Sequence, residues 1–220
     1  MQIRVLIAED HEIENIGVIN TLKELNVSEY SFANYCDDAY ALLQKALKED
    51  KPFDLLITDL GFVSDHRVQK LNSGQSLIRE ARALQPGLKI IAFSIEKRAA
   101  VIDELFKIYD VDGFVSKGRN DGKELRSTII KVMDGDKVMP QHILNSIRNT
   151  TQNLTPYDIQ LLQLIAKGWK QKEVEEYYKE HGIKPDSRSA IEKRLNDLRE
   201  TLNARNNIEM IVMCKDLGLI

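Results

Sequence analysis

The sequence predicts an α/β protein: a five-stranded, doubly wound parallel sheet followed by a small all-α domain. Two observations carry this prediction. Over the first 133 residues, short apolar runs alternate five times with amphipathic helical patterns, which is typical of parallel strands joined by right-handed crossovers. From residue 153 onward, apolar residues recur at helical spacing in four short segments separated by turn signals.

The five strands and the five helices between them follow from these runs. The strands are expected at residues 3–8, 30–35, 53–58, 88–93 and 113–116, and the helices at about 12–25, 37–49, 74–84, 97–107 and 121–133. Four of the five strands are continuously apolar, which is typical of strands that helices cover on both faces. In sheets of this kind, ligands bind at the carboxyl ends of the strands.

Composition and charge restrict the class of protein. The chain is 43% hydrophobic and 30% charged, with only 11 Gly and 5 Pro, which indicates a globular rather than a disordered chain. No apolar run is long enough to cross a bilayer and the N-terminus lacks a signal-peptide pattern, so we expect a cytoplasmic protein with no membrane partner. Cys36 and Cys214 lack metal-binding spacing and are expected to be reduced thiols. The net charge of −3 argues against nonspecific binding to nucleic acid.

Polar side chains stand at the carboxyl ends of four of these strands. Glu9 and Asp10 follow the first strand and Asp59 follows the third. Ser94 ends the fourth strand and Lys117 follows the fifth. Three carboxylates at one sheet edge repel one another unless a divalent cation neutralises them, and oxygen ligands suit Mg²⁺. With a hydroxyl and an ammonium group beside them, the set predicts a site for one phosphoryl group and its metal ion.

Residues 1–133 resemble the receiver domain of two-component response regulators, which has the CheY-like fold. The matching segments are Ile7-Ala8-Glu9-Asp10, Leu55-Leu56-Ile57-Thr58-Asp59, Ile90-Ile91-Ala92-Phe93-Ser94 and Gly113-Phe114-Val115-Ser116-Lys117. The resemblance implies that Asp59 is the phospho-acceptor and that the phosphohistidine of a sensor kinase is the donor. A carboxylate oxygen would attack the phosphorus in line, so the domain would carry a reversible acyl phosphate rather than turn over a substrate.

The resemblance also implies roles for the residues around Asp59. It implies that Glu9, Asp10, Asp59 and the backbone carbonyl of Gly61 are ligands of Mg²⁺. It also implies that Ser94 and Lys117 bind the phosphoryl group and that Phe114 is the aromatic switch residue. Each residue taken alone has an ordinary alternative. Ser94 would serve as a helix cap, Lys117 as a solvated loop charge and Phe114 as core packing.

The segment after Asp59 departs from the family pattern. The Met-Pro pair that usually follows the phospho-acceptor is absent, and the matching glycine is Gly74, farther along the chain than in the family. The polar insertion, residues 64–73, is expected to be a mobile loop beside the site. Its charged or titratable side chains, Asp65, His66, Arg67 and Lys70, are within reach of a phosphoryl group or a kinase, although a plain solvated loop is the favoured interpretation.

A polar, turn-rich stretch at residues 134–152 is the predicted linker to a second domain at 153–220. Thr155 is a predicted N-cap and Pro156 a predicted first helical residue. Four helices are expected, at about 156–167, 170–180, 187–203 and around 208–212. Four short helices joined by Gly-containing turns predict a helix-turn-helix module.

This second domain resembles the DNA-binding domain of the LuxR/NarL family over residues 153–218. The resemblance is carried by Leu154-Thr155-Pro156, by the run Leu161–Gly168, and by Ile191, Leu195, Leu198 and Leu202 ahead of Arg205-Asn206-Asn207-Ile208-Glu209. It implies that the third helix enters the major groove of double-stranded DNA. The candidate base contacts are Lys193 and Asn196 with Ser189 on the same face, and the candidate phosphate contacts are Lys184, Arg188, Arg194 and Arg199.

The charge of the helical half leaves its function open. Residues 150–220 hold 11 Lys/Arg and 11 Asp/Glu, so nonspecific affinity for DNA is expected to be small. The leading hypothesis is a bacterial transcriptional response regulator that binds DNA as a homodimer after phosphorylation of Asp59. The alternative is a receiver whose helical domain binds a protein partner. An aspartate-nucleophile phosphohydrolase is disfavoured. A resemblance to those enzymes would need an Asp-x-Asp motif, and the residue two after Asp59 is Gly61.

Overall fold

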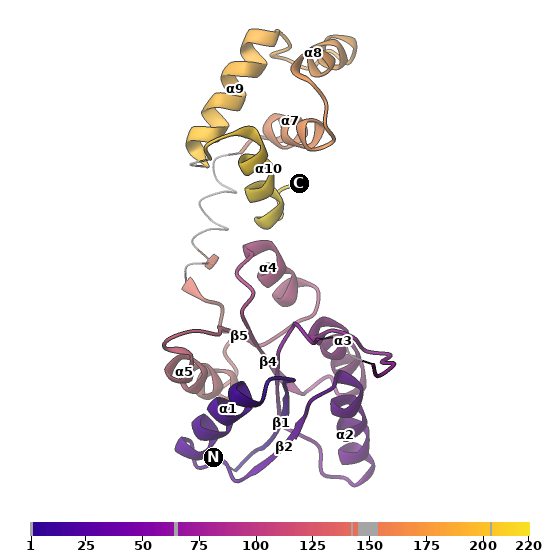
Figure 1. The fold of residues 1–220 in the computed structure, drawn as a ribbon, viewed down its shortest axis with the longest axis vertical. Coiled ribbons are helices and arrows are strands. Elements are labelled where there is room, and N and C mark those ends of the chain that lie inside the picture. The colour runs from indigo at the N-terminus through magenta and orange to yellow at the C-terminus, as the bar shows by residue number, and fades with distance from the viewer. Residues whose placement is uncertain (1, 64–65, 142, 145–153, 203) are drawn as a thin grey trace. The chain divides into compact units, whose positions relative to one another are not determined.

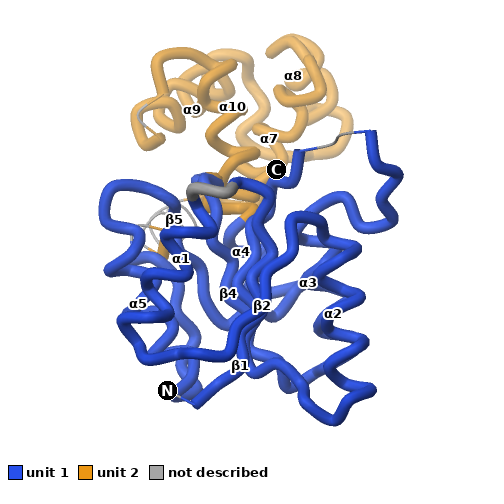
Figure 2. Tube along the Cα trace, turned by 60° about the horizontal axis from the view of Figure 1, so that its bottom comes forward, with its two compact units in different colours: residues 1–97, 102–141 blue, residues 98–101, 142–220 orange. Residues whose placement is uncertain are grey.

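A computed structural model describes residues 2–63, 66–141, 143–144, 154–202 and 204–220. The chain divides into two compact units, residues 1–97 with 102–141 and residues 98–101 with 142–220 (Figure 2). None of the helices in the described part of the chain combines the length and the apolar content needed to span a bilayer. The predicted domain limits at residues 133 and 153 stay predictions, because 145–153 lie outside the described residues.

The first unit contains the expected parallel sheet, with strand order β2-β1-β3-β4-β5. The strands are β1 Arg4–Ala8, β2 Glu29–Ala33, β3 Leu55–Thr58, β4 Lys89–Ser94 and β5 Gly113–Ser116. The helices are α1 Glu12–Glu24, α2 Cys36–Lys48, α3 Gly74–Leu84, α4 Ala99–Lys107 and α5 Asp121–Met133. Helices α1 and α5 lie on one side of the sheet and α2 and α3 on the other (Figure 1). The doubly wound fold class is therefore confirmed.

The core of this unit forms because the central strands are apolar on both faces. Every residue of β3 is buried, as are all but the first residues of β1 and β4. Alternate strand residues such as Ile7 and Ile57 pack against Leu22 of α1 and Ile129 of α5. Polar side chains are thereby confined to the strand ends, which is where the site forms. Cys36 is a buried free thiol, as expected.

The start of the predicted linker contacts the sheet. Val138 forms a parallel bridge with Gly113 at the free edge of β5. Its N–H donates to the carbonyl of Asp112 at 2.8 Å, and its carbonyl accepts from the N–H of Phe114 at 3.0 Å. These bonds cover part of the β5 edge, which would otherwise expose unpaired backbone groups.

In the second unit, residues 154–202 and 204–220 form helices α7 Pro156–Ala166, α8 Gln171–Glu180, α9 Arg188–Thr201 and α10 Asn207–Asp216. Three begin at side-chain caps, because Thr155, Ser187 and Asn206 accept hydrogen bonds from the backbone N–H groups of Asp158, Ala190 and Glu209. The expected apolar stripe of α9 is buried: Ile191, Leu195, Leu198 and Leu202. Trp169 packs against this core and meets Tyr177 edge to face, as a packing residue rather than an exposed ring.

Candidate functional sites

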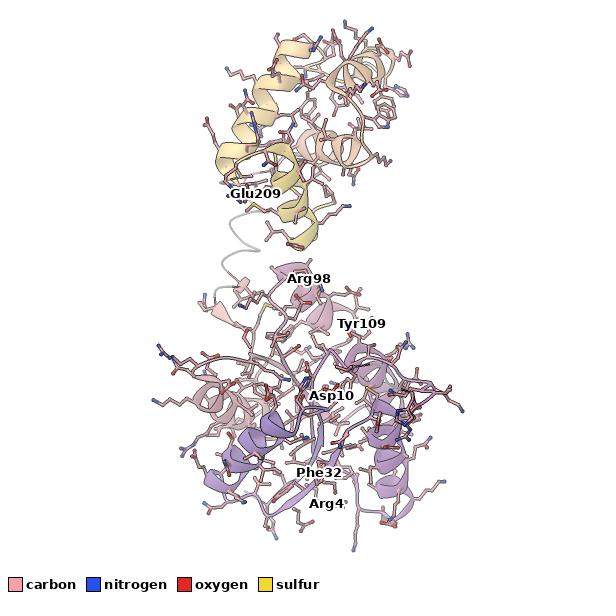
Figure 3. All side chains as sticks on the ribbon, in the orientation of Figure 1. Arg4, Asp10, Phe32, Arg98, Tyr109 and Glu209 are labelled. Atoms are coloured by element: carbon pink, nitrogen blue, oxygen red, sulfur yellow. The ribbon has the colours of Figure 1, made fainter. Side chains whose placement is uncertain are left out.

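The predicted acidic residues meet at the carboxyl edge of the sheet. Parallel pairing of Ala8 with Thr58 places the residues that follow them, Glu9 and Asp59, side by side, and the N–H of Asp59 donates to the carbonyl of Ala8 at 3.0 Å. Glu9 is 2% exposed and Asp59 is 5% exposed. Asp10 lies where β1 ends (Figure 3) and is less buried. Two buried carboxylates at this edge require a counter-cation.

Lys117 provides that cation. Its Nζ lies 2.7 Å from Glu9 Oε2 and 2.7 Å from Asp59 Oδ2, and its side chain is only 7% exposed. Burial alone would lower the pKa of Lys117, but the hydrogen bonds to the two carboxylates outweigh it and hold that pKa above its usual value. The backbone N–H of Lys117 donates to the carbonyl of Ser94 at 2.9 Å, which fixes the ends of β4 and β5 to each other.

Asp59 is held in one orientation by donors on both oxygens. The N–H groups of Leu60 and Gly61 donate to Oδ1 at 2.6 and 3.3 Å, while Lys117 donates to Oδ2. The observed contact of Gly61 is therefore through its amide. The expected role of its carbonyl as a metal ligand stays a prediction.

The acidic residues fit a divalent cation. One ligand atom each from Glu9, Asp10, Asp59 and His11 lies within 4.8 Å of the others. Carboxylate oxygens are the ligands that Mg²⁺ prefers, so the predicted metal residues are compatible with that ion. His11 is the member that sequence reasoning missed. The available signal was its position directly after Glu9 and Asp10.

Ser94 is the last residue of β4 and Phe114 is the second residue of β5, and both are buried. Ser94 is 2% exposed and its hydroxyl accepts a long hydrogen bond from the N–H of Glu96 at 3.5 Å. Phe114 is 1% exposed and belongs to the core. Burial is what core packing of Phe114 requires, and its switch role stays a prediction.

Gly74 lets the start of α3 approach the backbone that follows β3. A Cβ at this position would lie 1.9 Å from the backbone oxygen of Asp59 and 2.7 Å from the Cα of Leu60. The N–H of Gly74 donates to the carbonyl of Leu60 at 3.0 Å. The glycine that follows the insertion thus has a packing function at the site, despite its unusual distance along the chain.

We expect Gly74→Ala to lower the free energy of unfolding of the sheet unit by about 2 kcal/mol or more, because the added methyl overlaps backbone atoms that cannot rotate away. Urea unfolding followed by circular dichroism measures the change. Gly87→Ala is the matched control, since nothing lies within 4 Å of a Cβ at that glycine. Equal effects of the two substitutions would contradict the prediction.

The insertion after Asp59 contacts the beginning of α2 rather than forming a plain solvated loop. Arg67 pairs with the carboxylate of Asp38 through two nitrogens, at 2.8 and 2.6 Å, and its guanidinium lies over the Tyr35 ring. The backbone N–H groups of Lys70 and Leu71 donate to Asp37 at 2.8 and 2.9 Å. Of the other two candidates, His66 is exposed and Asp65 lies outside the described residues.

The pKa of Glu9 is raised because burial outweighs the stabilising contacts with Lys117. In the absence of a divalent ion, the folded state therefore holds the Glu9 proton more tightly than the unfolded state does. The contribution to stability falls as pH rises from the unfolded value near 4.5 through the folded pKa.

We expect Glu9→Gln to reduce the loss of stability between pH 4.5 and neutral pH, because glutamine carries no charge to desolvate. Urea unfolding in EDTA at the two pH values tests this, with Glu14→Gln on α1 as the control. An unchanged pH dependence would show that ionised Glu9 costs the fold nothing.

The predicted DNA-contacting residues differ in solvent exposure and in the partners of their side chains. Lys184, Arg188, Ser189, Lys193 and Asn196 are exposed, whereas Arg194 and Arg199 are half-buried. Within the described part of the chain, Lys193 makes no ion pair, while Lys184 pairs with Asp186 and Arg199 donates to Asn196. A hollow beside the C-terminal half of α9 is lined by Asn196, Arg199, Glu200, Ala204 and Arg205.

Arg194 has a structural partner that the sequence did not reveal. Its Nε and one terminal nitrogen donate to the two oxygens of Asp158 at 2.6 and 2.7 Å, and the Asp158 side chain is fully buried. Because this pair fixes the guanidinium to α7, we remove Arg194 from the proposed phosphate contacts.

Comparisons with known proteins give a likeness of fold. No family model matches the chain, and no curated protein matches it in sequence. A solved structure of the RcsB response regulator of Salmonella typhimurium is 22% identical with a TM-score of 0.63, covering 97% of this chain and 98% of that one. The structure of an RcsB–DNA complex is 22% identical with a TM-score of 0.62, covering 98% of this chain and 99% of that one.

A third structure resembles the first unit by itself. The isolated REC domain of RcsB from Salmonella enterica serovar Typhimurium, solved with the phosphomimetic BeF₃⁻, is 24% identical with a TM-score of 0.53, covering 66% of this chain and 98% of that domain. At these identities the comparisons establish the architecture. The chain has the fold of a response regulator, a receiver unit followed by a helical unit.

Proposed function

We propose that this chain is a bacterial two-component response regulator that a sensor histidine kinase phosphorylates on Asp59. The observation that carries the proposal is the Lys117 bridge, in which one buried ammonium group holds both Glu9 and Asp59. Such an arrangement presents an oriented carboxylate and a fixed positive charge at the same place. A phosphoryl group arriving there finds both its nucleophile and its counter-charge.

The chemistry of the transfer follows from these positions. An oxygen of Asp59 attacks phosphorus in line, a P–O bond forms, and the bond from phosphorus to the donor histidine nitrogen breaks with its electron pair returning to the imidazole. The Lys117 ammonium group then forms an ion pair with the phosphoryl oxygens, and the Ser94 hydroxyl donates a hydrogen bond to one of them. Mg²⁺ held by Glu9, Asp10 and Asp59 would supply further neutralisation of the charge on those oxygens. The product is an acyl phosphate on the protein itself, so the chain is not a turnover enzyme.

The phosphorylation test uses the full chain with acetyl phosphate and Mg²⁺, and intact-mass spectrometry reports the bound phosphate. The wild type is expected to gain one phosphate and Asp59→Asn none. Asp136→Asn is the control, because Asp136 is an exposed carboxylate that follows α5. Phosphate on Asp59→Asn at the wild-type level would contradict the proposal.

We further propose that the helical unit binds double-stranded DNA and that phosphorylation favours a homodimer with two such units. The similar RcsB chain has been solved in a complex with DNA, which supports this assignment. Lys193 on α9 is the best single candidate for a base contact, since it is exposed and makes no ion pair with another described residue. A homodimer that binds DNA through both of its helical units would compensate for the weak affinity expected of one neutral unit.

Fluorescence anisotropy with labelled genomic fragments tests this assignment, at low and high salt and with phosphorylated protein. Lys193→Ala is expected to weaken binding, whereas Lys215→Ala, an exposed lysine of α10, serves as the control. Absence of binding at low salt would instead favour the alternative, a helical unit that binds a protein partner.

A further inference from the structure

The imidazole of His11 lies against the acidic cluster. Its Nδ1 is 2.9 Å from Asp10 Oδ1 and 3.4 Å from Glu9 Oε1, and its backbone N–H donates to that same Glu9 oxygen at 3.2 Å. The ligand atoms of His11, Glu9, Asp10 and Asp59 lie within 4.8 Å of one another. Ligands on opposite sides of one transition ion are about 4.2 Å apart, so little movement would bring all four onto a single ion.

The two oxygens of Glu9 face different groups. Oε2 accepts from Lys117, whereas Oε1 faces His11. The two oxygens of Asp10 also face different groups. Oδ1 faces His11, and Oδ2 accepts from the N–H of Val63 at 2.7 Å. The oxygens that are not bound to Lys117 or to Val63 therefore converge on the imidazole. This is the side of the cluster on which a cation would be shared by two carboxylates and a nitrogen.

We propose that His11 is a ligand of the divalent ion, so that the site has a nitrogen donor and prefers transition ions such as Mn²⁺ and Ni²⁺ over Mg²⁺. The inference rests on the proposed function, since it concerns the metal site beside Asp59. Imidazole is a good ligand for first-row transition ions, whereas Mg²⁺ binds oxygen almost exclusively. The His11 side chain is 59% exposed, so the ring can turn toward an ion without disturbing the core.

The ordinary alternative is that His11 only orients Asp10 through their hydrogen bond. The two roles predict different results for His11→Asn, because the asparagine amide can still donate to Asp10 but supplies no imidazole nitrogen. If His11 only orients Asp10, the substitution keeps that hydrogen bond and leaves the affinities for Mg²⁺ and Ni²⁺ nearly unchanged. If His11 is a ligand, it weakens Ni²⁺ binding selectively.

Pulsed electron paramagnetic resonance of Mn²⁺ bound to the full chain gives the direct readout. The wild type is expected to show electron spin echo modulation from a coordinated imidazole nitrogen, and His11→Asn is expected to lose it. His66→Asn and His181→Asn are matched controls that should retain the modulation, since these histidines lie in the insertion and at the end of α8. Loss of the signal in His66→Asn instead of His11→Asn would overturn the inference.

Titration calorimetry measures the selectivity of the site for Ni²⁺ over Mg²⁺. We expect His11→Asn to weaken Ni²⁺ binding about tenfold or more and to change Mg²⁺ binding less than about twofold. Bound Mn²⁺ without nitrogen modulation would overturn the role of His11 and leave the proposed phosphorylation site intact. Absence of any Mn²⁺ binding, together with no phosphorylation of Asp59 in Mg²⁺, would overturn the proposed function as well.

Discussion

Replacing Asp158 by alanine is expected to lower the free energy of unfolding of the helical unit by about 3 kcal/mol or more. Asp158 is fully buried, and each of its oxygens accepts from Arg194. The same carboxylate accepts from the backbone N–H and the hydroxyl of Thr155, at 2.8 and 2.7 Å, which closes the N-terminus of α7. Removing it leaves the guanidinium of Arg194 half-buried without this counter-charge. It also removes the carboxylate half of the capping box, while the Thr155 hydroxyl can still accept from the backbone N–H of residue 158.

The sole tryptophan makes this measurement specific to the helical unit. Trp169 lies in that unit, so its fluorescence during urea unfolding reports the helical unit rather than the sheet. Asp197→Ala is the matched control, because the Asp197 carboxylate is 4.0 Å from the same arginine but is 46% exposed. We expect the control to change the stability by less than about 1 kcal/mol. A similarly small change for Asp158→Ala would show that the buried pair contributes little.

The pH dependence gives a second check on the same pair. Burial raises the pKa of Asp158, but the hydrogen bonds from Arg194 and Thr155 outweigh it and hold the pKa below the usual value of 3.8. The folded state thus binds this proton less tightly than the unfolded state. The stabilisation is present above the unfolded pKa and is lost as pH falls through the folded pKa. Asp158→Asn is expected to remove that part of the acid dependence.

Local pattern was sufficient for most of the fold. The bounds of α3 and α5 agree with the expected 74–84 and 121–133. Helix α3 begins at the Ser73 capping box, and α5 ends just before Gly135, whose φ of 101° is not helical. The predicted bounds were less accurate where the sequence has no clear start or stop signal. Strand β2 spans Glu29–Ala33 rather than 30–35, since an edge strand has fewer buried side chains to define its period.

The acidic site could be predicted because all its members stand at strand ends, and parallel strands bring those ends together. Contacts between distant residues could not be predicted in this way. The pairing of Arg194 with Asp158 spans 36 positions, and the anchoring of Arg67 by Asp38 spans 29. Helical spacing shows which face of α9 is polar, but it does not show which arginine on that face already has a partner.

Replacing Lys117 by methionine is expected to slow the transfer of phosphate to Asp59 by about 100-fold or more. The ammonium group is the only described cation bonded to both Glu9 and Asp59, and it is positioned before any phosphoryl group arrives. Loss of one preorganised donor to a developing anion typically lowers a rate by about 100 to 1000-fold. Without Lys117, the two buried carboxylates also repel an incoming anion. The rate is measured with acetyl phosphate by intact-mass spectrometry.

Two further variants separate the position of the charge from the charge itself. Lys97→Ala removes an exposed lysine that lies three residues after Ser94, and it is expected to leave the rate nearly unchanged. Lys117→Arg keeps a positive charge but replaces the compact ammonium by a planar guanidinium at a position where the native side chain is 7% exposed. We expect this variant to remain slow as well, because the larger group cannot place one donor 2.7 Å from both carboxylates. Recovery of the wild-type rate by arginine would mean that the site needs only a net positive charge, and the geometric account of Lys117 would then be wrong.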